Sequence, residues 1–521
     1  MKKLFYNGTI ITMEEENSNA VLIENGIIKA LGEEALTFLN EAIDKVDLKR
    51  KTMLPGFIDS HSHFAAFVST LGLVNLKECT SFREMVETLK KFELENIEES
   101  NEPIIGFGYD QNFLEEKMHP TKQILDEISR PVLVSHVSGH MGVANSKMLE
   151  LLGIQSETKD PIGGKIGRDQ NGLTGYLEET AFHQCATVLP KNLEQLMGQV
   201  QKAQQLYFQY GITTAQEGLM RETEFQLLKL ASDQGKLQLD LIGYVDLKNS
   251  AQIVKDHPEY VRKYQNHFKI GGYKLILDGS PQGRTAWMLK PYEDNPSYCG
   301  YPSYQDDELK ELIRTSLKDR LQLLTHANGD AASEQLIRCF EEVQKKFHFQ
   351  DLARPVMIHA QFVRENQLRR MKKLGMIASF FVAHTFYWGD IHLQNFGEKR
   401  AYKISPVKTA IQEGVCYTFH QDTPVILPNM WETIWCAVNR QTKTGITLGK
   451  SEQISVLEAL RGVTTHAAYQ YFEEMKKGSI KVGKQADLII VDQNPFTISP
   501  EKLKEIQVVQ TYKNGILVYE Q

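Results

Sequence analysis

The chain has 521 residues, 41% of them hydrophobic, which is enough for a large catalytic domain and at least one smaller domain. Its formal charge of -7 is spread along the sequence without a basic stripe, so nucleic acid is not an expected partner. No apolar stretch approaches the roughly 20 residues of a membrane span, and no two cysteines form a C-x-x-C pair. We therefore expect a small-molecule partner, no membrane association and a cytoplasmic location.

Both ends of the chain predict short strands. Runs of β-branched and aromatic residues at 3–12, 20–30 and 511–519 each carry an Asn-Gly pair of the kind that closes tight hairpins. A further strand is predicted at 486–492. We expect one small β-sandwich domain built from residues 1–52 and 473–521.

The middle of the chain alternates short apolar strands with longer helical stretches, a pattern typical of a parallel α/β sheet. Eight strands are predicted, at 53–61, 211–217, 237–246, 271–278, 321–326, 355–361, 376–381 and 414–422. They indicate a (β/α)8 TIM-like barrel over residues 53–472, with its chemistry at the carboxyl ends of the strands. Residues 70–208 exceed an ordinary crossover, so we expect an inserted lid subdomain there that covers the barrel mouth.

Polar side chains gather where these strands end. Strand side chains alternate between faces, so His61 and His63 are expected to point the same way from the end of the first strand, toward one metal ion. The other strands contribute Lys274, His326, His359 and Asp422. The alternative interpretation is that the histidines only cap or pack strand ends and that Asp422 caps the turn before Thr423-Pro424.

Seven motifs follow one another in a recognisable order. They are Pro55-Gly-Phe-Ile-Asp-Ser-His-Ser-His, Ser138-Gly-His-Met-Gly-Val-Ala-Asn-Ser-Lys, Lys274-Leu-Ile-Leu-Asp-Gly-Ser, His326-Ala-Asn-Gly-Asp, Ile358-His-Ala-Gln, Phe419-His-Gln-Asp-Thr-Pro-Val and Lys477-Gly-Ser-Ile-Lys-Val-Gly-Lys-Gln-Ala-Asp-Leu. The set spans nearly the whole chain and resembles the amidohydrolase superfamily. Within it, the chain is most similar to the amidohydrolase-3 branch, which includes YtcJ-like proteins and N-substituted formamide deformylase.

The resemblance implies a metal site. Its ligands would be His61, His63, His326, His359 and Asp422, with Lys274 as a carboxylated bridge between two metals. Imidazole and carboxylate ligands suit zinc, while iron and manganese stay open, as does the choice of one or two ions per chain. Lys274 has two alternatives, since it could anchor substrate or form a salt bridge while Glu217 supplies a carboxylate instead.

The site implies a metal-dependent hydrolase that cleaves a non-peptide C–N bond of the amide type. Metal-activated water would attack the carbonyl, and Asp422 would act as the general acid and base. A catalytically silent small-molecule sensor is the alternative from another class. A deaminase or a lactonase could use the same metal shell.

Four further residues are candidates for substrate binding: Tyr109, His140, Arg284 and His384. Arg284 could clamp a carboxylate or instead order its loop through a salt bridge, and structural roles are open for the other three. The sequence departs from close relatives at Val382-Ala383-His384 and Ser280-Pro281-Gln282, so a deformylase substrate is not implied. A homodimer is expected only because dimers are the commonest assemblies of soluble proteins.

Overall fold

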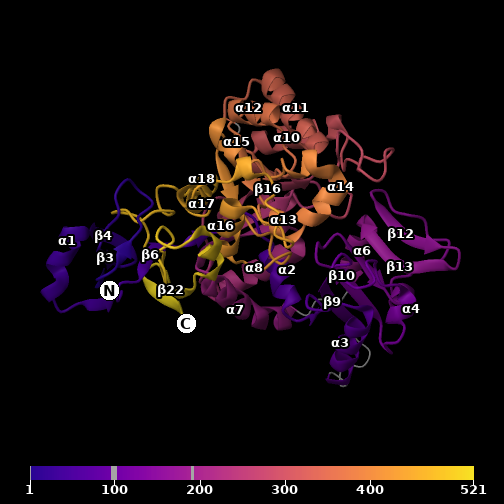
Figure 1. The fold of residues 1–521 in the computed structure, drawn as a ribbon, viewed down its shortest axis with the longest axis horizontal. Coiled ribbons are helices and arrows are strands. Elements are labelled where there is room, and N and C mark those ends of the chain that lie inside the picture. The colour runs from indigo at the N-terminus through magenta and orange to yellow at the C-terminus, as the bar shows by residue number, and fades with distance from the viewer. Residues whose placement is uncertain (1, 96–102, 189–192, 352) are drawn as a thin grey trace. The chain divides into compact units, whose positions relative to one another are not determined.

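The computed structural model describes residues 2–95, 103–188, 193–351 and 353–521 (Figure 1). The chain divides into two compact units, one formed by residues 1–65 and 200–521 and the other by residues 66–199. No helix in the described ranges is long and apolar enough to cross a membrane.

The first unit is built around an eight-stranded sheet in which every neighbouring pair of strands is parallel. The strands follow chain order from one edge to the other: β7 (Phe57–Ile58), β14 (Ile212–Met220), β15 (Asp240–Asp246), β16 (Phe268–Ile276), β17 (Gln322–Ala327), β18 (Val356–His359), β19 (Ile377–Phe380) and β20 (Tyr417–Phe419). The predicted α/β class with eight TIM-like strands is confirmed. All seven residues of β15 and all four of β18 are buried, as expected for parallel strands covered on both faces.

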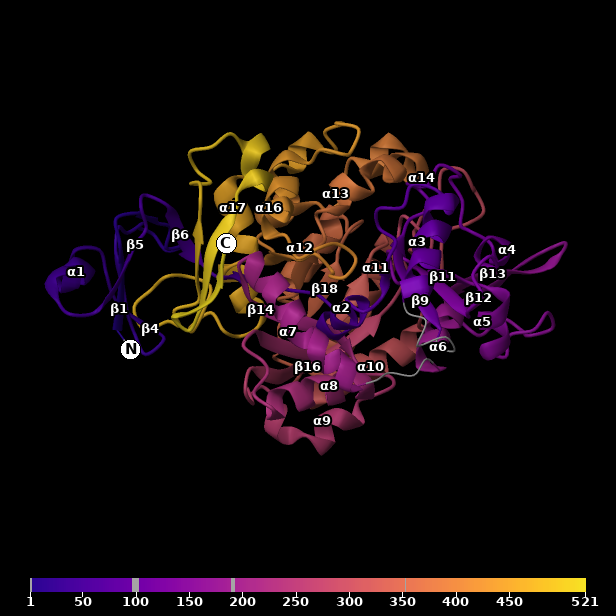
Figure 2. The same cartoon turned by 90° about the horizontal axis from the view of Figure 1, so that it is seen from below.

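Helices separate these strands along the chain and also follow the last strand, β20 (Figure 2). They are α8 (Glu222–Asp233), α9 (Gln252–Asp256), η3 (Pro258–Tyr260), α10 (Asp306–Lys318), α11 (Asp330–Phe347), α12 (Glu365–Lys373), α13 (His384–Tyr387), α14 (Gly389–Ala401), α15 (Val407–Gln412), α16 (Met430–Asn439), η4 (Lys450–Glu452), α17 (Val456–Gly462) and α18 (Thr465–Gln470). Two more, α2 (Phe64–Thr70) and α7 (Leu193–Gln209), contain the points where the chain passes between the units.

The first predicted strand, 53–61, is wrong as a single element. Residues Thr52–Pro55 form β6 and pair with the terminal strand β21, whereas β7 begins at Phe57 and pairs with β14. The backbone changes partner at Gly56, whose N–H donates to Asp487 O (2.8 Å) just before Phe57 N–H donates to Gly211 O (2.9 Å). A Cβ at Gly56 would lie 2.6 Å from the Thr213 side chain, so this crossing point requires glycine.

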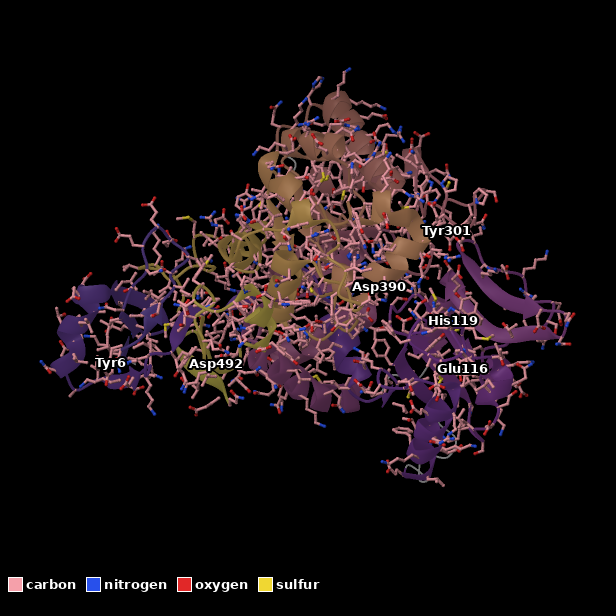
Figure 3. The ribbon with its side chains drawn as sticks, in the orientation of Figure 1. Tyr6, Glu116, His119, Tyr301, Asp390 and Asp492 are labelled. Carbon is pink, nitrogen blue, oxygen red and sulfur yellow. The ribbon has the colours of Figure 1, made fainter. Side chains whose placement is uncertain are left out.

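The chain ends form two small sheets. One has the order β4-β3-β1-β5, from β1 (Lys2–Tyr6), β3 (Val21–Glu24), β4 (Ile27–Leu31) and β5 (Asp44–Asp47). The other has the order β2-β6-β21-β22-β23, from β2 (Thr9–Ile10), β6, β21 (Leu488–Val491), β22 (Val508–Lys513) and β23 (Ile516–Glu520). Figure 3 labels Tyr6 at the end of β1 and Asp492 directly after β21. Residues of both sheets, including Phe5, Met53 and Leu488, share one apolar cluster.

Two of the three Asn-Gly pairs close hairpins. Asn25-Gly26 joins β3 to β4 and Asn514-Gly515 joins β22 to β23, and all four residues have positive φ, as tight hairpin turns require. Asn7-Gly8 does not close a hairpin, because β1 and β2 belong to different sheets. Helices α1 (Gly32–Leu36) and η1 (Thr37–Asn40) follow β4, and η5 (Pro500–Glu505) precedes β22.

The second unit contains a six-stranded sheet of order β12-β13-β11-β10-β9-β8. Its strands are β8 (Val74–Asn75), β9 (Ile104–Tyr109), β10 (Val132–His136), β11 (Met141–Ala144), β12 (Gly164–Asp169) and β13 (Gly172–Glu179), and its helices are α3 (Phe82–Glu95), α4 (Lys122–Leu125), α5 (Ser146–Leu151) and α6 (Thr180–Val188). This unit has apolar clusters of its own, so residues 66–199 form a compact body within the chain. The predicted covering of the barrel mouth by this region stays a prediction.

Candidate metal centre

His61 and His63 converge on one carboxylate oxygen. Nε2 of each ring lies 3.3 Å from Oδ1 of Asp422. Strand alternation is not the cause, because β7 already ends at Ile58. Backbone bonds hold the segment instead: Asp422 N–H donates to His61 O (3.2 Å) and His63 N–H donates to Thr423 O (2.8 Å). The two edges of the eight-stranded sheet thus meet at this site.

His326 and His359 come from the adjacent strands β17 and β18, and their rings meet edge to face with centroids 4.4 Å apart. Nδ1 of His326 lies 3.1 Å from Nε2 of His359, which lies 4.0 Å from Oδ2 of Asp422. His359 and Asp422 have φ values of 71° and 56°, a region that non-glycine residues rarely occupy. Such local strain is typical of functional sites, where the surrounding structure holds the side chains in place.

Lys274 is buried on β16 beside these histidines. Its Nζ lies 2.9 Å from Nε2 of His61. Burial lowers the pKa of Lys274 to about 7, although the carboxylates of Asp422 and Glu217 oppose this shift. Among the described residues Lys274 forms no ion pair, since Glu217 Oε2 accepts from Ala65 N–H (2.7 Å) and Glu217 Oε1 faces His63 Nδ1 at 3.8 Å.

Burial and charge set the protonation of this group. Burial lowers the pKa of His61 and of His359 well below the ordinary value. Burial also disfavours a charged His63, but the neighbouring carboxylates of Asp422 and Glu217 outweigh it and raise the pKa of His63 to about 9. Burial alone would raise the pKa of Asp422, yet the three imidazoles hold it well below the ordinary value. The result is an ionised carboxylate beside two neutral imidazoles.

These residues fit a divalent metal ion. His61, His359 and Asp422 each offer one ligand atom, and these three atoms lie within 4.8 Å of one another. Oδ1 of Asp422 is buried and has no hydrogen-bond partner within the described ranges, although it faces two imidazole nitrogens. A buried, unpartnered carboxylate oxygen is costly unless a cation or donor satisfies it. Neutral imidazole and carboxylate are also the ligands that divalent transition metals prefer.

A family model described as the amidohydrolase family matches residues 44–519. The chain belongs to this family. Over the whole of both chains it is 28% identical to a protein named putative amidohydrolase YtcJ from Bacillus subtilis (strain 168). It is 26% identical to N-substituted formamide deformylase from Arthrobacter pascens, with 99% of this chain and 98% of the relative covered.

A solved structure agrees with these sequence matches. It is an uncharacterised metal-dependent hydrolase from Pyrococcus horikoshii OT3, with a TM-score of 0.79 and 27% identity over 96% of this chain and 99% of that one. Together with the cluster of His61, His359 and Asp422, these matches identify the chain as a metal-dependent hydrolase of the amidohydrolase superfamily.

Two residues that the sequence analysis did not single out contact His359 and His61 through the ring nitrogen Nδ1 of each. His420 Nε2 lies 3.2 Å from His359 Nδ1, and Gln216 Oε1 lies 2.6 Å from His61 Nδ1. His420 lies directly after β20 in a motif already singled out for Asp422, so its position could have flagged it. Gln216 lies in the interior of β14, where an amide carries no comparable sequence signal.

Two of the predicted substrate-binding residues belong to the first unit. Arg284 donates from Nε to Asn395 Oδ1 (3.1 Å) and lies 2.6 Å from Asp294, so its present contacts match the loop-ordering alternative. His384 is buried, with its ring centroid 6.5 Å from that of His359 and 4.9 Å from that of Trp388. His384 therefore lies near the candidate metal centre, while Arg284 is engaged by Asp294 of its own loop and by Asn395 of α14.

The other two candidates belong to the unit of residues 66–199. Tyr109 is fully buried, and its hydroxyl lies 2.9 Å from Nδ1 of His119, the residue labelled in Figure 3. His140 Nδ1 lies 2.9 Å from Glu179 Oε2. Both side chains thus have partners within their own unit, and their role in substrate binding stays a prediction.

Proposed function

We propose that this protein hydrolyses a non-peptide C–N bond of the amide type in a small molecule. The observation that carries the proposal is the convergence of His61, His63 and His359 on the single ionised carboxylate of Asp422. In this proposal one or two divalent ions are held by His61, His63, Lys274, His326, His359 and Asp422. Zinc is favoured by the imidazole and carboxylate donors, with iron and manganese as the alternatives.

A bound divalent ion would polarise the substrate carbonyl and lower the pKa of water. Asp422 would supply the proton transfers. Its carboxylate is ionised, so it can accept the proton of the attacking water and return it to the departing nitrogen, which is otherwise a poor leaving group. His61 and His63 lie at one carboxylate oxygen of Asp422 and His359 lies nearer the other, which fixes the orientation of the proton acceptor.

Lys274 would contribute to the site after carboxylation. Because burial brings its pKa to about 7, a large fraction of the side chain is a neutral amine at neutral pH. The amine lone pair can attack carbon dioxide to form an N–C bond, and loss of one proton then gives a carbamate. The new carboxylate group would supply the oxygen ligands that an ammonium group lacks. The lack of an ion pair to Lys274 within the described ranges supports this role over that of a salt-bridged lysine.

The substrate is proposed only at the level of the bond class. The Arthrobacter relative is named for an N-substituted formamide, but the identity is 26%. At this level of identity we do not extend the formamide to this chain. We further propose a small-molecule substrate without nucleic-acid or membrane partners, a homodimer and a cytoplasmic location.

Product analysis tests the proposal. The metal-loaded protein would be incubated with a panel of N-substituted amides, cyclic imides and ureas, aminated heterocycles and lactones. Release of a substituted amine or of a ring-opened amide product supports the proposal. Ammonia release from heterocycles alone would instead indicate a deaminase, and acid release from lactones alone would indicate a lactonase. Binding of panel members without any turnover would favour the sensor.

A further inference from the structure

Ser60 links two buried hydrogen-bond chains that reach the candidate metal centre from the barrel interior. Its hydroxyl donates to Phe419 O (2.8 Å) and lies 3.2 Å from Ser379 Oγ. Its carbonyl oxygen accepts from Gln216 Nε2 (2.9 Å) and Gln470 Nε2 (2.8 Å). The five residues that make these bonds, Ser60, Gln216, Ser379, Phe419 and Gln470, are inaccessible to solvent. Both hydrogen-bond chains therefore consist of buried protein groups.

The first chain has a defined direction. A carbonyl oxygen can only accept, so the Ser60 hydroxyl donates its one proton to Phe419 O. Ser60 Oγ must therefore accept the hydroxyl proton of Ser379. Ser379 then has no proton for His420, whose Nδ1–H must donate to Ser379 Oγ (2.8 Å). His420 is inaccessible to solvent, which favours the neutral imidazole, so its Nε2 is an acceptor and receives the Nδ1–H of His359 at 3.2 Å. This leaves the Nε2 lone pair of His359 directed toward His326 and Asp422.

The second chain acts in the same way on His61. The amide NH2 of Gln216 faces two oxygen atoms, Ser60 O and Tyr471 Oη, each at 2.9 Å. Tyr471 itself donates to Asp59 O (2.8 Å), so its oxygen is available as an acceptor. The amide orientation leaves Gln216 Oε1 to accept the Nδ1–H of His61 at 2.6 Å. The Nε2 lone pair of His61 then faces Lys274 and Asp422.

We propose that Gln216 and His420 are positioning residues that hold His61 and His359 in the tautomer with a free Nε2 lone pair, and that Ser60 fixes the direction of both chains. The inference rests on the proposed function, in which these two histidines are metal ligands. A ligand histidine whose second nitrogen donates to a fixed acceptor is both oriented and made more basic. In this proposal the hydrogen bonds from His61 to Gln216 and from His359 to His420 orient both imidazoles before a metal ion binds.

Metal affinity tests the inference without reference to turnover. Zinc affinity of the purified full chain would be measured by chelator competition for the wild type, His420→Leu and His420→Gln. Loss of an outer partner of a ligand histidine typically weakens metal binding by about 10- to 100-fold. We expect that loss for His420→Leu and affinity within about threefold of the wild type for His420→Gln, whose amide can still accept from His359. Gln216→Leu should also weaken binding by at least about 10-fold.

His466→Leu is the matched control, because His466 is a partly buried histidine of the same unit that bonds to Tyr417 O (3.1 Å) and touches neither chain. It should leave zinc affinity unchanged. Should a leucine variant fail to fold, Ser379→Ala provides the same test, because it removes the acceptor of His420 Nδ1 without touching a ligand histidine. In the metal-free Ser379→Ala protein, nitrogen NMR of labelled histidine should show that His359 no longer holds its proton on Nδ1.

The outcomes separate the inference from the proposed function. Folded His420→Leu and Gln216→Leu proteins that bind zinc as tightly as the wild type would overturn the inference alone. A wild-type protein that binds no zinc, iron or manganese would overturn the proposed function instead.

Discussion

Nζ of Lys274 lies 2.9 Å from Nε2 of His61, a contact between two groups that both carry lone pairs when neutral. Burial disfavours charge on either of them, so a neutral amine can donate one N–H to the imidazole and keep its own lone pair for an electrophile such as carbon dioxide. This relationship leads to the first prediction.

Carbon dioxide should control the number of metal ions bound. Metal-free protein reloaded with zinc in bicarbonate-containing buffer should bind about two ions per chain, and the same protein in carbon-dioxide-depleted buffer should bind about one. Lys274→Ala should bind about one in both buffers, because it has no amine to carboxylate. A carbamate signal in carbon NMR with labelled bicarbonate would identify the adduct. Equal zinc content in both buffers for the wild type would contradict carboxylation.

Asp422→Asn should greatly reduce turnover. The amide is nearly the same size but cannot take up a proton at neutral pH, and loss of general acid–base catalysis typically lowers the rate by about 10²- to 10⁴-fold. The measurement is kcat on the best substrate of the product panel, with zinc content and thermal midpoint recorded in parallel. An unchanged kcat in a zinc-loaded variant would remove Asp422 from the proposed role.

Much of the fold and part of the site could be predicted because both depend on strands. Parallel strands bring their carboxyl ends to one edge, so Lys274, His326 and His359 could be expected together from sequence position alone. The change of sheet at Gly56 could not be predicted, because Pro55-Gly56 is equally compatible with the start of a strand and with a change of sheet. Gln216 also escaped detection, because its role depends on which of its amide atoms faces Ser60 beside the neighbouring strand β7.

A buried ion network joins the barrel to the terminal strands. Lys513 Nζ lies 2.6 Å from both Asp240 and Asp487, and Lys477 also pairs with Asp240. Lys513→Met should destabilise the protein by roughly 3–5 kcal/mol, because it removes the ion-pair partner of the buried Asp487 and leaves Asp240 with Lys477 alone of its two lysines. Urea unfolding provides the measurement.

The exposed pair of Lys229 and Asp233 is the matched control for that substitution. Lys229→Met removes an ion pair of similar length at the surface and should cost no more than about 1 kcal/mol. Equal losses for Lys513→Met and Lys229→Met would show that the buried network stabilises the protein no more than a surface ion pair does.

The same network predicts the acid sensitivity of the fold. Burial alone would raise the pKa of Asp240, but Lys477 and Lys513 hold it well below the ordinary value. A carboxylate with a depressed pKa stabilises the fold above its unfolded pKa of about 4, and this contribution is lost as pH falls further toward the folded value. The thermal midpoint should therefore fall as the pH is lowered below about 4, and the fall should be shallower in Asp240→Asn. Identical profiles for the two proteins would contradict this assignment.

Metal content per chain, measured by plasma mass spectrometry on protein purified without chelator or metal-binding tag, tests the central claim most directly. We predict about two ions per chain in bicarbonate-containing buffer, and essentially none after His61→Ala and His359→Ala are combined. The contradicting result is a folded wild-type protein that retains no metal in preparations supplied with zinc, iron and manganese.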